Sequence, residues 1–174
     1  MTNAAEDVVR VWLQFCRKQF VMMNIPYPYM SKENKRMTRE IDILATDGGE
    51  KFADYEIKWR TTDWIGATES EKIPALVEQL KNKHREKEIR TIIKESFGVV
   101  SAPAVRKVLV TPRKHFGKTA FAERIEALTS AGIELVWFED ILEDLFKYLE
   151  EPQDKGQYDP STLAILRMAR HLSK

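Results

Sequence analysis

The sequence contains very little cysteine: Cys16 is the only one among 174 residues. A single cysteine cannot form a disulfide within the chain, and it cannot build a cysteine-based zinc site. We therefore expect Cys16 to be a packed thiol on the first helix. The sequence also lacks an apolar run of membrane-spanning length, and no signal peptide precedes the first predicted helix. These absences favour a cytoplasmic protein without a membrane partner.

An excess of charge of one sign is also missing, because 28 basic residues stand against 27 acidic ones and the net charge is +1. Such a balance does not by itself indicate a nucleic-acid partner, so the distribution of charge matters more. A solvated helix face explains any one basic group, but several together favour contact with the DNA backbone. The basic residues gather in three groups: Lys32, Lys35, Arg36 and Arg39; Lys81, Lys83, Arg85, Lys87, Arg90 and Lys94; and Arg106, Lys107, Arg113, Lys114 and Lys118.

The length of the chain and the order of its predicted elements indicate the fold class. A chain of 174 residues is long enough for one domain with a sizeable core. Apolar periodicity predicts a helix, three strands, a helix, a strand, a helix, a strand and two helices. This order is typical of a three-layer α/β/α domain with a central mixed sheet. We expect residues 1–150 to form the domain, and residues 151–174 to form a linker and a helix that packs on the domain or on a second subunit.

The stretch from Arg39 to Arg60 predicts a β-hairpin whose turn contains Asp47-Gly48-Gly49. Apolar side chains alternate along both strands, which is typical of half-buried strands: Ile41, Ile43, Tyr55, Ile57 and Trp59. The polar residues between them then share the opposite face: Glu40, Asp42, Glu56 and Lys58. Asp42 and Glu56 share that face only if the numbers of paired residues sum to an even value. A three-residue loop that pairs Thr46 with Glu50, or a bulge, satisfies this condition, and a two-residue loop does not.

Three carboxylates and a lysine on one sheet face predict a site for a divalent cation. The carboxylates repel one another unless something cationic lies among them. Carboxylate oxygens suit hard ions such as Mg²⁺. Because Lys58 follows Glu56 by two residues, it lies on the same side, where it can reach a phosphate or a water held by the metal. This combination fits phosphodiester hydrolysis, in which the metal lowers the pKa of a water and the lysine stabilises charge on the scissile phosphate.

The order Asp42, a turn, and then Glu56-Ile57-Lys58 resembles the motif of the PD-(D/E)xK nuclease superfamily. The surrounding strings, EIDILA and YEIKWR, look closest to its small Holliday-junction-resolvase-like and Mrr-like members. The resemblance implies a restriction-endonuclease-like fold. It also implies that Asp42, Glu56 and the backbone carbonyl of Ile57 bind Mg²⁺, for which Mn²⁺ could substitute, and that Lys58 is catalytic. The proline that gives the motif its first letter is absent, because Ile41 precedes Asp42.

Two further residues match positions that the superfamily uses. A glutamate on the first helix often assists, and Glu6 is the match; the favourable helix dipole explains an acid there equally well. Some branches carry a glutamine on the helix after the lysine strand, and Gln79 matches it; a glutamine on a charged helix is also commonly just solvated.

The resemblance and the residue pattern together predict a Mg²⁺-dependent DNA endonuclease, resolvase-like or a phage, plasmid or defence nuclease. Because no separate DNA-reading domain fits in the chain, we expect recognition of DNA shape or ends, or a homodimer whose two active sites address two strands. The alternative is a catalytically inactive module that retains the fold and binds nucleic acid or another protein.

Overall fold

The computed structural model describes residues 3–30, 34–49, 51–59, 72–99, 103–116, 121–150 and 161–172. Within these ranges the helices and strands follow the predicted order, except that two helices, not one, lie between the third and fourth strands. The helices are α1 (Ala4–Phe15), α2 (Lys72–Leu80), α3 (Lys83–Phe97), α4 (Phe121–Ser130), α5 (Phe138–Glu150) and α6 (Ser161–Leu172), with a short 3-10 helix at Arg113–Phe116. The strands are β1 (Phe20–Met30), β2 (Arg36–Thr46), β3 (Phe52–Ile57), β4 (Val105–Thr111) and β5 (Ile133–Trp137).

The five strands form one mixed sheet in the order β1-β2-β3-β4-β5. β2 pairs antiparallel with β1 and with β3, whereas β4 pairs parallel with β3, and β5 parallel with β4. A parallel neighbour requires a crossover connection, and the chain supplies helices between β3 and β4 and between β4 and β5. The predicted α/β class with a central mixed sheet is confirmed.

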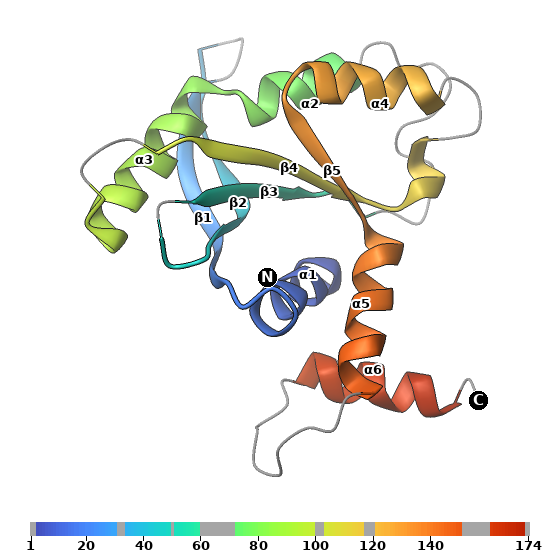
Figure 1. Ribbon diagram of the computed structural model, residues 1–174. Helices are drawn as coiled ribbons and strands as arrows, with labels where there is room; N and C mark the ends of the chain where they lie inside the picture. The colour runs from blue at the N-terminus through green and yellow to red at the C-terminus, as the bar shows by residue number, and fades with distance from the viewer. Residues whose placement is uncertain are drawn as a thin grey trace.

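Helices cover both faces of the sheet and make three layers (Figure 1). α1 and α5 pack on one face, where Trp12 and Leu13 meet Tyr55 and Val110 in one apolar cluster. α2, α3 and α4 lie on the other face (Figure 1). Two separate apolar clusters fill that second interface. One forms around Leu76, Leu109 and Leu128, and the other around Leu44, Phe52 and Ile93.

The hairpin between β2 and β3 has a longer loop than predicted. The last pair of the ladder is Thr46 with Phe52, so the loop spans residues 47–51 instead of the three residues we expected. Side chains take over the hydrogen bonding there: Thr46 Oγ1 accepts from the N–H of Gly48 at 3.2 Å, and Asp47 Oδ1 from that of Gly49 at 3.0 Å. The paired numbers still sum to an even value, so Asp42 and Glu56 remain on the same face of the sheet.

β3 is buried on both faces, although its alternating pattern predicted a half-buried strand. Every residue from Phe52 to Ile57 is buried. The reason is its central place in the sheet: the face that we expected to be open is covered by α2 and α3 (Figure 1). Polar residues on that face of β3 therefore lie inside the protein and need partners there.

The C-terminal helix α6 lies against α1 and α5 of the same chain. Leu163 is buried in the cluster that α1 and α5 form on the sheet, and the Thr162 hydroxyl donates to Asp7 on α1. The expected linker at residues 151–160 lies outside the described residues. In the part of the chain that the structure describes, no helix combines the length and the apolar character that a membrane span requires.

Candidate functional site

Asp42 lies on β2 and reaches toward the end of β3. Its Oδ2 accepts a hydrogen bond from the backbone N–H of Ile57 at 2.7 Å. Ile57 stands between Glu56 and Lys58, so this bond fixes the Asp42 carboxylate beside both of their side chains. Asp42 is half-buried. The predicted approach of a β2 aspartate to the glutamate and lysine of β3 is therefore present in the structure.

Glu56 is buried and holds three donors from three different directions. Gln79 on α2 donates its Nε2 to Oε1 at 2.7 Å, and Lys58 forms an ion pair with the same oxygen. Arg85 on α3 donates Nη1 to Oε2 at 2.7 Å. Four of the predicted site residues thus come together, since Asp42, Glu56, Lys58 and Gln79 share one region of the sheet face.

The surroundings of Asp42 disfavour the charged form of its carboxyl group. Burial, and next the negative charge of Glu56, raise the pKa of Asp42 to about 7. The hydrogen bond from Ile57 and the charges of Lys58 and Arg85 oppose this rise without cancelling it. A carboxyl in this condition gains from any added cation nearby, which is what a metal site provides.

A second set of buried charges, which we did not predict, adjoins Glu56. Asp54 precedes Glu56 by two residues on β3 and points to the same face. Arg85 donates Nε and Nη2 to the two oxygens of Asp54 at 2.9 and 2.6 Å. Lys107 on β4 donates to Asp54 Oδ2 at 3.0 Å. Asp42, Asp54 and Glu56 are therefore set against Lys58, Arg85 and Lys107, so the opposite charges balance in number.

The burial of Arg85 and Lys107 corrects two of the predicted DNA contacts. Arg85 is 0% exposed and Lys107 is 8% exposed, so neither offers its charge to a surface ligand. Burial alone would lower the pKa of Arg85, but the hydrogen bonds and charges of Asp54 and Glu56 outweigh it and keep that pKa raised. A sequence pattern assigns charged residues to the solvent-facing side, so it predicts that both Arg85 and Lys107 are exposed. The signal that could have indicated their burial is Asp54, an acid on a central strand that needs a buried partner.

The other members of the basic groups differ in how far they remain available. Arg106 pairs with Glu134 at 3.0 Å and Arg113 with Asp140 at 2.7 Å, so the third group is largely engaged in ion pairs. Lys32 and Lys118 lie outside the described residues. On α3, four exposed cations pair with no carboxylate of the described residues: Lys83, Lys87, Arg90 and Lys94.

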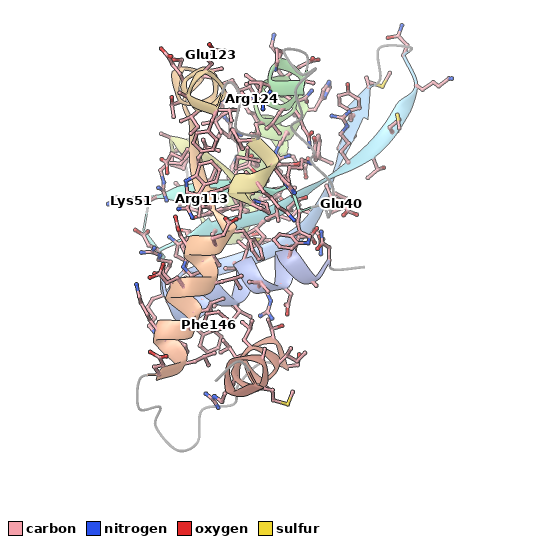
Figure 2. All side chains as sticks on the ribbon, turned by 90° about the vertical axis from the view of Figure 1, so that its right-hand side faces the viewer. Glu40, Lys51, Arg113, Glu123, Arg124 and Phe146 are labelled. Carbon is pink, nitrogen blue, oxygen red and sulfur yellow. The ribbon has the colours of Figure 1, made fainter. Side chains whose placement is uncertain are left out.

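Glu6 and Glu40 lie outside this arrangement. Glu6 is the third residue of α1 and closes a capping box, in which its Oε2 accepts from the backbone N–H of Asn3 at 3.3 Å. It makes no hydrogen bond or ion pair to Asp42, Glu56 or Lys58 within the described ranges. Glu40 is exposed on β2 (Figure 2) and shares no hydrogen bond or ion pair with Lys58, Arg85 or Lys107, the described cations that surround the buried acids. The three clustered carboxylates are therefore Asp42, Asp54 and Glu56, and the expectation that Glu40 belongs to them is wrong.

The donor set at the site suits a hard divalent cation, provided that a backbone oxygen takes part. No group of three or more His, Cys, Asp or Glu residues is arranged as metal ligands in the described part of the chain. Asp42 and Glu56 supply two carboxylates. The motif implies a third protein oxygen, the backbone carbonyl of Ile57, which lies between Glu56 and Lys58 in the chain. Oxygen ligands from carboxylates and carbonyls are those that Mg²⁺ prefers, and Mg²⁺ commonly keeps several waters.

Neither a family model, nor a curated protein, nor a solved structure matches this chain. Its function is therefore inferred from the motif and from the geometry of the site.

Proposed function

We propose that this protein is a metal-dependent endonuclease of the PD-(D/E)xK type that hydrolyses phosphodiester bonds in DNA. The observation that carries the proposal is the meeting of Asp42, Glu56 and Lys58. The two carboxylates come from adjacent antiparallel strands, share one sheet face, and adjoin a lysine that touches Glu56. A strand hairpin with no chemical role would have no use for an aspartate whose pKa is raised to about 7 at that point.

Asp42, Glu56 and the Ile57 carbonyl would hold Mg²⁺ or Mn²⁺ in this proposal. When bound, the ion would lower the pKa of a water and offset charge on the phosphate. Gln79 and Arg85 keep the Glu56 carboxylate in place from two sides. Lys58 would donate from Nζ to an oxygen of the scissile phosphate, which requires it to leave the Glu56 oxygen that it pairs with in the free protein.

DNA is the proposed partner because the outer face of α3 carries exposed cations that pair with no carboxylate among the residues that the structure describes. Lys83, Lys87, Arg90 and Lys94 border an open hollow of about 410 Å³. Lys83 and Lys94 are eleven residues apart, which corresponds to roughly 16 Å along a helix. A second copy of the chain is the other proposed partner. Ile165 and Met168 on α6 are 60% and 59% exposed, and apolar residues placed in this way favour a homodimer contact.

A plasmid-nicking assay tests the proposal. Supercoiled DNA is incubated with the protein and Mg²⁺, Mn²⁺ or EDTA, and the variants Asp42→Asn and Lys58→Met are compared with the wild type. The matched controls are Glu40→Gln and Lys51→Met, which remove the same charges from exposed positions at the periphery of the molecule (Figure 2). We expect nicking that needs the metal, falls at least about 100-fold in both site variants and is unchanged in both controls. Nicking that survives Asp42→Asn would refute the assignment.

One observation favours a second candidate, a catalytically inactive module that binds nucleic acid or protein. Both oxygens of Glu56 already accept from protein donors, so the network is internally satisfied without an added ion. An inert network of this kind predicts DNA retention, or a protein partner, with no cleavage in any metal. Gel-shift binding by a preparation that fails to nick duplex, branched and single-stranded DNA would select this candidate.

A further inference from the structure

Arg85 is a fully buried charge in the interior of the part of the protein that the structure describes. It comes from the first turns of α3, is 0% exposed, and bonds to two acids on the same face of β3. Burying an arginine is costly unless its donors are paired. Here three of its nitrogen atoms donate hydrogen bonds to Asp54 and Glu56, so the guanidinium is held by both acids.

The planar geometry of the Arg85 guanidinium sets the direction of each of these hydrogen bonds. Its plane is rigid, so the directions of its N–H groups are fixed relative to one another. Nε and Nη2 grip the two oxygens of Asp54, and this two-point contact sets the orientation of the whole group. Lys107 holds Asp54 from the neighbouring strand β4. The remaining donor, Nη1, is thereby aimed at Oε2 of Glu56.

The contact with Arg85 divides the two oxygens of Glu56 between different tasks. Oε2 is committed to Arg85, while Oε1 faces Gln79 and Lys58. Lys58 lies on the Oε1 side, because its Nζ pairs with that oxygen, and Asp42 bonds to the backbone N–H of Ile57, the residue between Glu56 and Lys58. Oε1 is thus the oxygen turned toward the position proposed for the metal.

We propose that Arg85 is a positioning residue, which holds the Glu56 carboxylate so that Oε1 faces the metal, and that Asp54 and Lys107 act through it. This inference rests on the proposed metal-dependent function. Outer contacts that orient a metal ligand typically change metal affinity 10- to 100-fold when they are removed. Arg85 touches neither the metal nor the substrate in this assignment, so it is not a catalytic residue.

Two rival roles make different predictions for Mn²⁺ affinity. If Arg85 only adds positive charge near the metal, its removal lowers the repulsion and tightens Mn²⁺ binding. If Arg85 only stabilises the fold, its removal lowers the melting temperature and leaves the affinity of the folded protein unchanged. A positioning role requires weaker binding. The three outcomes differ in direction, so one titration separates them.

The test measures Mn²⁺ binding by electron paramagnetic resonance at a temperature where each variant is folded by circular dichroism. Arg85→Met removes the guanidinium, Arg85→Lys keeps the charge but cannot bridge both acids, and Asp54→Asn loosens the two-point grip while Arg85 remains. Arg90→Met is the control, because Arg90 is an exposed arginine on the same helix. Should Arg85→Met fail to fold, Arg85→Lys and Asp54→Asn still decide the matter.

We expect Arg85→Met to weaken Mn²⁺ binding at least about 10-fold, Arg85→Lys and Asp54→Asn to weaken it by less, and Arg90→Met to leave it unchanged. Unchanged or tighter binding in Arg85→Lys and Asp54→Asn would overturn the positioning role. The nuclease proposal fails separately: a wild type that binds Mn²⁺ and loses affinity in the Arg85 variants, yet cleaves no DNA, supports positioning and refutes the endonuclease. A wild type that binds no Mn²⁺ overturns both.

Discussion

Asp42 on β2 and Ile57 on β3 are joined by a hydrogen bond of 2.7 Å from the backbone N–H of Ile57 to the Asp42 carboxylate. This bond spans the two strands just beyond Ile43 with Tyr55, the pair at the end of the ladder farthest from the hairpin loop. It ties the aspartate to the segment that carries Glu56 and Lys58. The position and the charge of Asp42 can therefore be tested separately, because an asparagine can still accept this hydrogen bond.

The substitution Asp42→Asn is expected to stabilise the metal-free protein at high pH. The pKa of Asp42 is about 7 in the folded protein against the ordinary value of 3.8 for an aspartate, so the folded state binds a proton that the unfolded state releases between these pH values. Well below pH 3.8 the group is neutral in both states; as pH rises from there toward 7 the folded state loses stability, and above 7 the penalty is complete. Asparagine removes that penalty, which we estimate at roughly 2–4 kcal/mol.

Urea unfolding in EDTA at pH 4 and pH 8 measures this effect. The variant should match the wild type at pH 4 and exceed it at pH 8. Asp47→Asn is the control, because Asp47 is exposed in the hairpin loop. A variant that is no more stable than the wild type at pH 8 would show that the raised pKa is absent.

Gln79 is expected to matter through its bond to Glu56. Gln79→Ala removes the 2.7 Å hydrogen bond to Oε1 and leaves Lys58 as the partner of that oxygen. We expect unfolding free energy to fall by about 1 kcal/mol, and metal-dependent nicking to fall about 10-fold. Glu78→Ala, at the exposed neighbouring position of α2, should change neither quantity. Equal nicking by both variants would mean that Gln79 plays no part in the site.

Glu6 is expected to act as a helix cap. Its carboxylate closes the capping box at the start of α1. Glu6→Ala should therefore lower the free energy of unfolding by about 0.5–1 kcal/mol and leave the rate of nicking unchanged. Glu6→Gln, which can still accept the bond from Asn3, should recover most of the stability. A rate that falls in both variants without a matching loss of stability would instead support the catalytic role implied by the resemblance.

The exposed cations of α3 are expected to set the salt dependence of DNA binding. Each phosphate contact contributes about 0.9 to the slope of log affinity against log salt concentration. The double variant Lys87→Gln, Arg90→Gln should therefore reduce the slope by roughly 2. Fluorescence anisotropy measures the slope, with Asp42→Asn present in every protein so that the DNA is not cleaved. Lys51→Gln with Lys147→Gln removes the same charge from other exposed positions and should leave the slope unchanged. Equal slopes in the two double variants would exclude α3 from the DNA contact.

The fold and half of the site could be predicted because both depend on local pattern. Alternation along residues 39–60 predicts two strands and places Asp42 and Glu56 on one face whenever the register is even. The length of the loop could not be predicted in the same way, because Thr46 and Asp47 replace ladder bonds with side-chain bonds. Any loop that keeps the sum of the paired residue numbers even places Asp42 and Glu56 on the same face. The error in the predicted loop length therefore did not change the predicted site.

Arg85 could not be predicted from its own surroundings in the sequence. It stands in the run KNKHREK, where every neighbour is polar, and helix periodicity places such a run in solvent. Its burial depends on Asp54 and Glu56, which are 31 and 29 residues away. Pairing over such a distance is a property of the folded sheet and of the helix laid across it. Buried acids on a central strand are thus the feature to look for, and their partners have to be found in space.

The most direct test of the metal site is the position of the metal itself. A crystal soaked in Mn²⁺ gives an anomalous difference map in which the ion identifies its own ligands. We predict a peak bounded by the carboxylates of Asp42 and Glu56 and the carbonyl of Ile57, and no peak there in Asp42→Asn. A map with no peak at that position, or with Mn²⁺ bound at another acidic surface and unaffected by Asp42→Asn, would contradict the account.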